Sequence, residues 1–480
     1  MKNKVRSLKL GDGLIAVLVC TLVMSLTFSG FAQEVVTLHL ACDGGANIAP
    51  FEWMEDEIET ENPIDLVFHP LPYEEVYSKL KAEFIGQTGA YDIVVFWPKL
   101  LGDFVVNGYL LPLDEFNQKL GVHMDDVLLP FREFYCKSEG KLYALPYDGD
   151  ILCMFYRKDL FNHPEERKAF KQEYGYDLRP PETWNEWLNV GEFFTRKKGE
   201  KLAGKTLEHN FYGLATYGQR DFLYCWWFNR YASAGGSYFD EDMKPLINTP
   251  EAVAALQNHI DSLKFAPPEV LTYGFDELQA AFIQDQVAME INWTDVGRVG
   301  SDPRVSKVVG KIGTALVPGT RLPDGTVHHR PIMAAGRIMG ITKTCKYPKL
   351  AFEVIRMMAL DASLAYVSSS YSGMDPFRYS HFDTPGAFGM FANYEEAKSY
   401  LDGVKANHEA GYPELTMPGS PQYMDVLTLA ISEVLLGKKS AKEALDRVAV
   451  EWNKITQKMG PEIQKKYYRS LIKSWKQFGY

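Results

Sequence analysis

Three short apolar segments, separated by stretches of helical periodicity, restrict this chain more than any other feature of its sequence. They are residues 35–42, 64–69 and 91–97, of which the last, YDIVVFW, is almost continuously apolar. Such runs are typical of strands covered on both faces, as in a parallel sheet with crossover helices. Helical patterns around Phe51 and over 73–84 separate them. This region is therefore predicted to fold as βαβαβ, which places the chain in the α/β class.

The segment from Gly140 to Phe161, GKLYALPYDGDILCMFYRKDLF, is organised differently. Gly140 and Pro146 interrupt stretches rich in Tyr, Ile and Phe, which favours two extended segments joined by a polar elbow. Asp148 and Asp150 lie in that elbow. No nucleophile with a nearby base and no metal-ligand spacing accompanies these carboxylates, so the segment indicates binding rather than catalysis.

The rest of the chain is richer in helices. Thr183, Thr249 and Ser440 are N-cap residues of three predicted helices. Two further strands are expected at 311–317 and 337–342. A chain of 480 residues is too long for one ordinary core. Since it contains no repeat, low-complexity tract or Pro-rich linker, we expect closely associated domains.

The N-terminal segment, residues 1–32, has the pattern of a secretory signal peptide. Basic side chains occupy its first part, an apolar run extends from Leu14 to Leu26, and Gly30 and Ala32 provide small residues for cleavage. An uncleaved anchor is the alternative, but the apolar run is short for a membrane span. We expect cleavage, and therefore a periplasmic mature protein.

Charge and cysteine content exclude several classes of partner. Residues 1–32 carry four basic side chains and one acidic side chain, so their removal takes the formal charge from −11 to −14. Nucleic acids and anionic membranes bind basic faces, so neither is an expected partner. Five cysteines remain, without a CxxC or paired His motif, which argues against a metal site. Buried thiols are expected, with one disulfide as the alternative.

Motifs spread from about Val35 to about Ile455 resemble, in matching order, the family 1 extracellular solute-binding proteins of ABC importers. This is the carbohydrate-binding family whose best-known member is maltose-binding protein. The motifs are YDIV (91–94), GYLLPLDE (108–115), PETWNEW (181–187), YG (212–213), GGSYFD (235–240) with LINTPE (246–251), FIQDQVAMEINW (282–293) and MPGSPQ (417–422).

The resemblance implies a two-lobed, type II periplasmic-binding-protein-like α/β fold with a hinge and a ligand cleft between the lobes. Residues 33–147 and 314–344 would form the first lobe. Residues 148–313 and 345–480 would form the second. The chain would cross between them near 147–151, 313–318 and 341–346.

Aromatic side chains are the first candidates for a carbohydrate site, because flat apolar rings cover the C–H faces of sugars. Trp97 ends a predicted buried strand, where ligands of open α/β sheets bind. By family position, Trp97 and Trp293 fall where stacking residues occur. Tyr224, Trp226 and Trp227 lie where the family places cleft aromatics, although they cannot all face one way.

Polar candidates lie in predicted loops. Asp43 and Asn47 follow the first strand, and Asp148 and Asp150 occupy the elbow. Carboxylates accept hydrogen bonds from sugar hydroxyls, and such charge-assisted bonds are strong.

Arg378, in a Gly- and Pro-containing loop, offers a fixed fork of donors. A salt bridge to Asp375 or Asp383 is the alternative role for this arginine. Tyr423 is the aromatic nearest the late loop, which lacks the tryptophan of the maltose-binding branch. Lys99 and two leucines replace that branch's charged pair after Trp97. We therefore do not expect maltodextrin specificity.

These observations predict a periplasmic, monomeric substrate-binding protein that captures a carbohydrate or polyol and delivers it to an ABC permease. No catalytic residue, cofactor or metal is expected. Two alternatives stay open at this point: a secreted glycoside hydrolase, and the same fold with a polyamine or ferric iron as its ligand.

Overall fold

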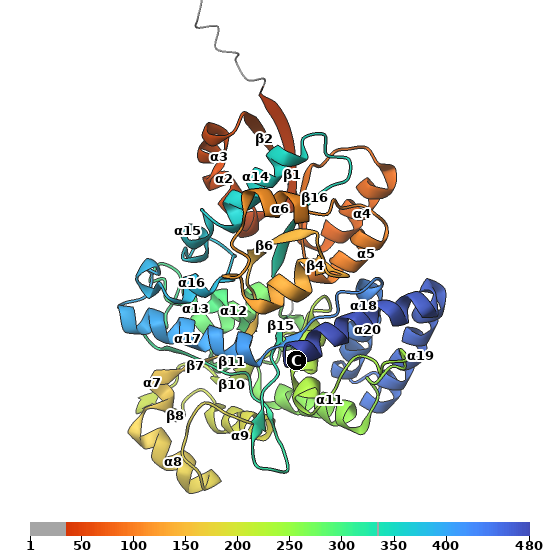
Figure 1. Ribbon diagram of the computed structural model, residues 1–480. Coiled ribbons are helices and arrows are strands. Elements are labelled where there is room, and N and C mark those ends of the chain that lie inside the picture. The colour runs from red at the N-terminus through yellow and green to blue at the C-terminus, as the bar shows by residue number, and fades with distance from the viewer. Residues whose placement is uncertain (1–34, 334–335) are drawn as a thin grey trace, which may run out of the picture.

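The chain folds into two lobes, each built on its own sheet (Figure 1). A computed structural model describes residues 35–333 and 336–480. The expected signal peptide, residues 1–32, lies outside the described residues. The predicted α/β class and two-lobed architecture are confirmed, because each sheet is covered by helices and the chain passes between the sheets more than once.

The first lobe contains a five-stranded sheet of order β2-β1-β3-β16-β6. The strands are β1 (Val36–Asp43), β2 (Ile64–Leu71), β3 (Ile93–Phe96), β6 (Ala144–Asp148) and β16 (Arg337–Ile341). β1 pairs in parallel with β2 and β3, whereas β16 runs antiparallel to β3 and β6. The predicted βαβαβ order is confirmed, and the four residues of β3 are fully covered, as their continuous apolarity indicated.

Helices surround this sheet in the upper part of Figure 1. They are α2 (Ala49–Trp53), α3 (Glu55–Glu61), α4 (Val76–Gly86), α5 (Leu101–Val106), α6 (Asp114–Leu120), α14 (Pro348–Ala359) and α15 (Ser363–Val367). Helix α4 turns Val76, Leu80 and Phe84 inward, at the spacing of one helical face.

The second lobe contains a four-stranded sheet of order β10-β11-β7-β12. The strands are β7 (Leu152–Arg157), β10 (Tyr212–Ala215), β11 (Val287–Trp293) and β12 (Ile312–Ala315). β11 is the most enclosed, because all seven of its residues are buried. Trp293 is the last residue of β11 and lies at the end of this strand that faces the first lobe.

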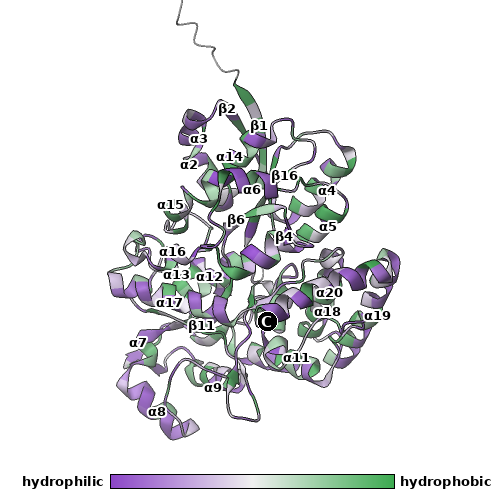
Figure 2. Ribbon diagram, viewed as in Figure 1, coloured by the Kyte–Doolittle hydropathy of each residue, from purple (hydrophilic) through white to green (hydrophobic). Residues whose placement is uncertain are grey.

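The second lobe is the more helical one, as predicted. Its helices are α7 (Lys158–Phe161), α8 (Pro164–Tyr174), α9 (Trp184–Phe194), α10 (Leu223–Ser233), α11 (Pro250–Ser262), α12 (Phe275–Ile283), α13 (Asp295–Val299), α16 (Tyr379–Phe382), α17 (Tyr394–Ala410), α18 (Ser420–Leu435), α19 (Ala441–Met459) and α20 (Pro461–Gln477). The predicted caps are confirmed, because Thr183, Thr249 and Ser440 each accept a backbone hydrogen bond at the start of a helix. Figure 2 shows α8 as largely hydrophilic at the outer edge of this lobe.

The chain crosses from the first sheet to the second through only three residues, 149–151, because β6 ends at Asp148 and β7 begins at Leu152. It returns through 316–336. Within this return, β13 (Thr320–Arg321) and β14 (Val327–His328) form a hairpin. The turn predicted at 323–325 joins these two strands.

Two lobe boundaries differ from the expected ones. The strand β12 extends to Ala315 and pairs with β7, so residues 314 and 315 lie in the second lobe. Helix α14 was expected in the second lobe. It packs instead against β6 and β16 of the first sheet. Its apolar face, which includes Phe352 and Ile355, is buried. The sequence pattern marked α14 as amphipathic without indicating which sheet would cover that face.

All five cysteines of the described chain are free, and each is buried. This is the arrangement expected for thiols that act as small apolar side chains. Among residues 35–333 and 336–480, we find no helix with the length and hydropathy of a membrane span.

Candidate functional site: a cavity between the lobes

A cavity of about 540 Å³ lies between the two lobes. The first lobe contributes the loop after β1 and the start of β16, and the second lobe contributes the end of β11 and the loops around it. The residues that define the walls best are Asn47, Tyr73, Glu74 and Arg337 from the first lobe, and Asp150, Tyr217, Phe275, Trp293 and Asp295 from the link and the second lobe. The site therefore forms where β1 and β11 end, as expected for open α/β sheets.

Aromatic rings form one wall of the cavity. Trp293 is 4% exposed and stands perpendicular to Trp226, with ring centroids 5.1 Å apart. Trp226 in turn stacks on Tyr217 at 4.5 Å. Tyr217 and Trp293 line the cavity, while Trp226 packs behind both. The wall is thus a rigid apolar surface of the kind that sugar rings and carbon chains contact.

Arg337 is the polar centre of the first-lobe side. Its guanidinium binds Asp43 through two nitrogens, at 3.0 and 2.7 Å, and Asp148 through the third, at 2.8 Å. The strand register explains the second contact, since Arg337 of β16 pairs with Asp148 of β6. Asn47 donates to Asp43 at 2.6 Å. Asp43 and Asp148 therefore hold Arg337, and Asn47 is oriented at the surface of the cavity.

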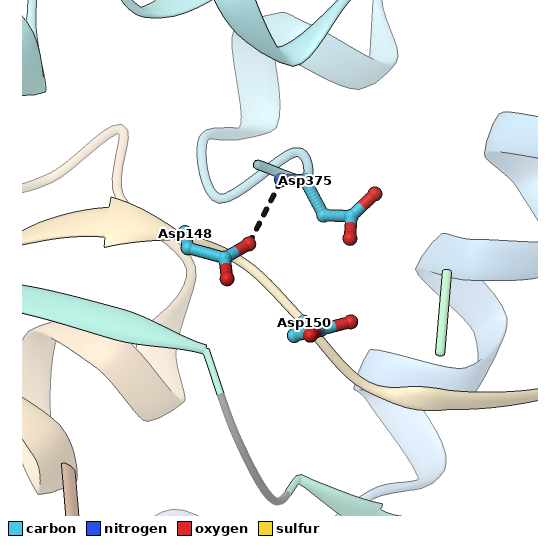
Figure 3. Close-up of side chains that lie close together, drawn as sticks. All are labelled: Asp148, Asp150 and Asp375. Atoms are coloured by element: carbon cyan, nitrogen blue, oxygen red, sulfur yellow. Dashed lines mark hydrogen bonds between the residues drawn. The ribbon is translucent and has the colours of Figure 1, made fainter. Parts of the chain in front are cut away.

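Three carboxyl groups meet at the link between the lobes (Figure 3). Asp148, Asp150 and Asp375 each place an oxygen within 4.8 Å of the others. The backbone N–H of Asp375 donates to Asp148 at 2.8 Å, and Arg298 binds the Asp375 carboxylate at 2.8 Å. Because these bonds and Arg337 occupy both oxygens of Asp148 and one oxygen of Asp375, the trio fits hydrogen bonding to a ligand better than metal ligation.

Burial changes the protonation of this group. It raises the pKa of Asp148 to about 7, an effect that Arg337 partly offsets. Burial, followed by the neighbouring charges of Asp148 and Asp375, also raises the pKa of Asp150 well above its usual range. Asp150 accepts a hydrogen bond from the Thr294 hydroxyl at 3.1 Å. The link therefore holds one carboxyl group, that of Asp148, with a pKa of about 7, and a second, that of Asp150, whose pKa lies well above its usual range.

The structure brings three of the predicted residues, Asn47, Asp150 and Trp293, to the cavity wall. Asp43 and Asp148 lie directly behind it as partners of Arg337. Trp97 also lies behind the wall. Its ring packs edge-on against that of the wall residue Tyr73, with ring centroids 5.0 Å apart.

The three aromatics predicted on α10 are all buried. Trp226 donates to the carbonyl of Ile291 at 2.8 Å, and Trp227 donates to that of Ala252 at 3.1 Å. Tyr224 donates to the Glu414 carboxylate. Tyr224 and Trp227 thus belong to the core of the second lobe and lie away from the cavity, because α10 is covered on all sides.

Arg378 and Tyr423 also lie elsewhere. Arg378 is 2% exposed, pairs with Asp126 at 3.4 Å and donates to three backbone carbonyls, so its role is structural, with Asp126 as its salt-bridge partner in place of the expected Asp375 or Asp383. Tyr423 is fully buried and its hydroxyl contacts Thr456 at 2.8 Å. Both side chains have structural partners that hold them away from the cavity.

Several wall residues escaped the sequence prediction, among them Tyr73, Tyr217, Asp295 and Arg337. Asp295 follows the predicted Trp293 by two residues, so the end of that strand could have indicated it. Arg337 begins a predicted strand, but nothing in the sequence shows that this strand lies beside Asp148. Only the order of the strands in the sheet places Asp148 of β6 beside Arg337 of β16.

Comparisons with known proteins agree with this geometry. Residues 45–364 match the family model of the bacterial extracellular solute-binding proteins. A probable ABC transporter-binding protein of Deinococcus radiodurans is 26% identical over 446 residues, which cover 88% of this chain and 94% of the relative. A mannitol-binding protein of Pseudomonas aeruginosa is 26% identical over 62% of this chain and 64% of its own length.

Among solved structures, an ABC transporter solute-binding protein from Agrobacterium radiobacter K84 in complex with ribitol has the same fold. Its TM-score is 0.71 at 24% identity, and the match covers 88% of this chain and 99% of that one. The family match spans well over half of the chain, and its members bind solutes outside the cell membrane. The chain belongs to the bacterial extracellular solute-binding proteins.

Proposed function

We propose that this protein captures a carbohydrate or a polyol in the interlobe cavity and delivers it to an ABC permease. The observation that carries the proposal is the composition of the cavity wall, where the rings of Trp293 and Tyr217 face carboxyl groups and Arg337. The rings suit the carbon skeleton of such a ligand, and the charged groups suit its hydroxyls. The names of the mannitol-binding relative and the ribitol complex support the same ligand class.

The mechanism is binding with closure of the lobes. A ligand that contacts both walls stabilises the closed arrangement by its differential affinity for the closed and open states. Only three residues join β6 to β7, which supports a hinge at 149–151. The closed, loaded monomer then docks on the permease from the periplasm. No covalent bond of the ligand changes in this cycle.

A calorimetric and thermal-shift panel of sugars and alditols on the mature protein tests the proposal. Ligand binding raises the melting temperature by mass action. Recovery of the intact ligand after incubation, measured by NMR, tests the absence of turnover. A melting temperature that no sugar or alditol changes would contradict the ligand class, and a cleaved ligand would contradict the binding role.

Replacement of Trp293 by alanine gives a narrower test. We expect a loss of affinity of about tenfold or more, because one aromatic contact contributes on the order of 1–3 kcal/mol. The matched control is Trp53→Ala, since Trp53 is 47% exposed on the surface of the first lobe. Equal affinities of the two variants would remove Trp293 from the site.

A further inference from the structure

The cavity wall carries more acidic than basic groups. Six acidic residues line it: Glu74, Asp150, Asp221, Asp276, Glu277 and Asp295. Arg337 is the one basic residue among the described residues of the wall. Its guanidinium is already paired with Asp43 and Asp148. The negative charge of the wall is therefore not compensated by the residues that form it.

Some of these acidic groups have local structural roles. Asp221 accepts the Tyr217 hydroxyl at 2.6 Å, and Glu277 accepts the backbone N–H of Gly274 at 2.9 Å at the start of α12. Asp150 accepts from Thr294. These bonds explain why the three side chains are present without reference to a ligand.

Asp295 has no such explanation. It lines the cavity and is only 8% exposed, yet its carboxyl group has no hydrogen bond or ion pair with any residue of 35–333 or 336–480. The nearest arginine of its own helix, Arg298, binds Asp375 at 2.8 Å instead. An ionised carboxyl group at this position is costly without a hydrogen-bond donor, so the position favours a ligand group that donates.

Asp375 adds a second unsatisfied acceptor close by. Its Oδ2 atom is buried and has no hydrogen-bond partner in the described part of the chain. Asp375 and Asp150 present carboxyl oxygens within 4.8 Å of each other, and Figure 3 shows the two side chains on the same side of the link. Carboxyl oxygens without a hydrogen-bond donor thus occur at the link, on Asp375, as well as on Asp295.

The rest of the wall suits a cation. The rings of Tyr73, Tyr217, Phe275 and Trp293 line the same cavity. Aromatic faces attract ammonium groups, and this attraction is stronger where water is excluded. Carboxylates and aromatic faces together are complementary to a compact positive charge on an otherwise hydroxylated ligand.

We propose that the ligand is an aminated carbohydrate or polyol, an amino sugar or an amino alditol, whose ammonium group binds between Asp295 and Asp150. The inference rests on the proposed function and specifies its ligand class. The ammonium supplies the hydrogen-bond donors that Asp295 lacks, and the hydroxyls bond to the remaining polar groups of the wall.

The protonation of the site supports this assignment. Burial raises the pKa of Asp295 to about 8, with contributions from Asp375 and Asp148 that raise it and from Arg298 and Arg337 that lower it. Asp150 faces the same cavity. At pH 6 a proton therefore occupies Asp295. An ammonium ligand displaces that proton, so the affinity of an amine that keeps its own proton over this range, such as an amino alditol, rises between pH 6 and pH 8.5, whereas a neutral polyol loses nothing at pH 6.

Matched ligand pairs test the inference by titration calorimetry of the mature protein. The pairs are glucosamine with glucose, 1-amino-1-deoxyglucitol with glucitol, and 1-amino-1-deoxyribitol with ribitol. In at least one pair, we expect the amine to bind tenfold or more tightly than its neutral partner. Titrations in two buffers of different ionisation enthalpy should detect proton release for that amine and none for the neutral partner.

Variants separate the role of Asp295 from the total charge of the wall. Asp295→Asn should reduce the affinity for the amine to within twofold of that for its neutral partner. Asp276→Asn is the matched control at an exposed wall position and should change the preference less than twofold. Neutral binding without an amine preference would overturn this inference and leave the proposed function standing. Failure of every neutral and aminated ligand would overturn both.

Discussion

Arg337 shows how one residue organises the site through bonds to two buried carboxylates. Its guanidinium is shared between Asp43 at the end of β1 and Asp148 at the end of β6. These strands are not neighbours, since β3 and β16 separate them in the sheet. The arginine therefore fixes the loop after β1 relative to the start of the link.

Replacement of Arg337 by leucine should destabilise the protein by about 3–5 kcal/mol, because two buried carboxylates lose their counter-charge. Urea unfolding measures this change. Arg220→Leu is the control, because its pair with Asp425 is largely exposed and should contribute less than about 1 kcal/mol. Equal losses in the two variants would show that Arg337 has no special structural role.

Asp295 gives a pH prediction for the ligand-free protein. Because burial raises the pKa of Asp295 to about 8, the native state keeps a proton that the unfolded chain releases near pH 4. The stability contributed by this residue therefore falls as pH rises from about 4 to about 8.

Asp295→Asn is uncharged at every pH and should be more stable than the parent at pH 8, by on the order of 2 kcal/mol. Near pH 4 the two proteins should be alike. Urea unfolding at both values tests this. A difference that is the same at both values would mean that the carboxyl group of Asp295 has an ordinary pKa.

At the scale of elements, the three-residue link between β6 and β7 is tightly packed. Gly149 is its first residue and donates its backbone N–H to the carbonyl of Asp375 at 3.0 Å. A Cβ atom on Gly149 would lie 2.1 Å from the carbonyl oxygen of Pro376. Backbone atoms cannot yield as a flexible side chain does, so only glycine fits at this position.

Gly149→Ala should therefore displace the 375–377 loop, with a loss of about 1–3 kcal/mol in unfolding free energy and a lower ligand affinity. Gly386→Ala is the control, because a Cβ there meets no atom within 4 Å. Thermal melting and calorimetry of both variants provide the comparison. An unaltered Gly149→Ala variant would mean that the link has room to move.

Much of the fold could be predicted from sequence because its elements have strong local signals. The apolar runs gave the strands β1, β2 and β3, and capping hydroxyls gave the starts of α9, α11 and α19. The lobe that receives α14 could not be predicted, since its amphipathic face fits either sheet. In the site, strand ends indicated Asn47 and Trp293, whereas Arg337 depended on a neighbour almost 190 positions away, Asp148.

At the scale of the whole molecule, contacts between the lobes extend beyond the cavity. Lys99 of the first lobe lies over the ring of Phe222 of the second lobe, 3.8 Å from its centroid. The Phe222 ring also lies 5.9 Å from that of Trp97. This arrangement joins the lobes on a second surface, with the ammonium of Lys99 between them.

Lys99→Gln should weaken the closed arrangement, because a cation–π contact contributes about 0.5–2 kcal/mol. Small-angle X-ray scattering should give a larger radius of gyration than for the parent without ligand, and the same radius at saturation. The control is Lys81→Gln, because Lys81 lies over Tyr77 within a single helix, α4. A similar change in both variants would exclude a specific role for Lys99.

The shortness of the 149–151 link also has a kinetic consequence. Asp148 directly precedes this pivot and Asp150 lies within it, so a rotation of the lobes about the link moves both through short arcs, while side chains farther along the walls travel farther. A ligand can thus be recruited to the pivot before the walls come together. Substitutions beside the pivot should mainly slow association, and substitutions on the distant walls should mainly shorten the residence time of the ligand.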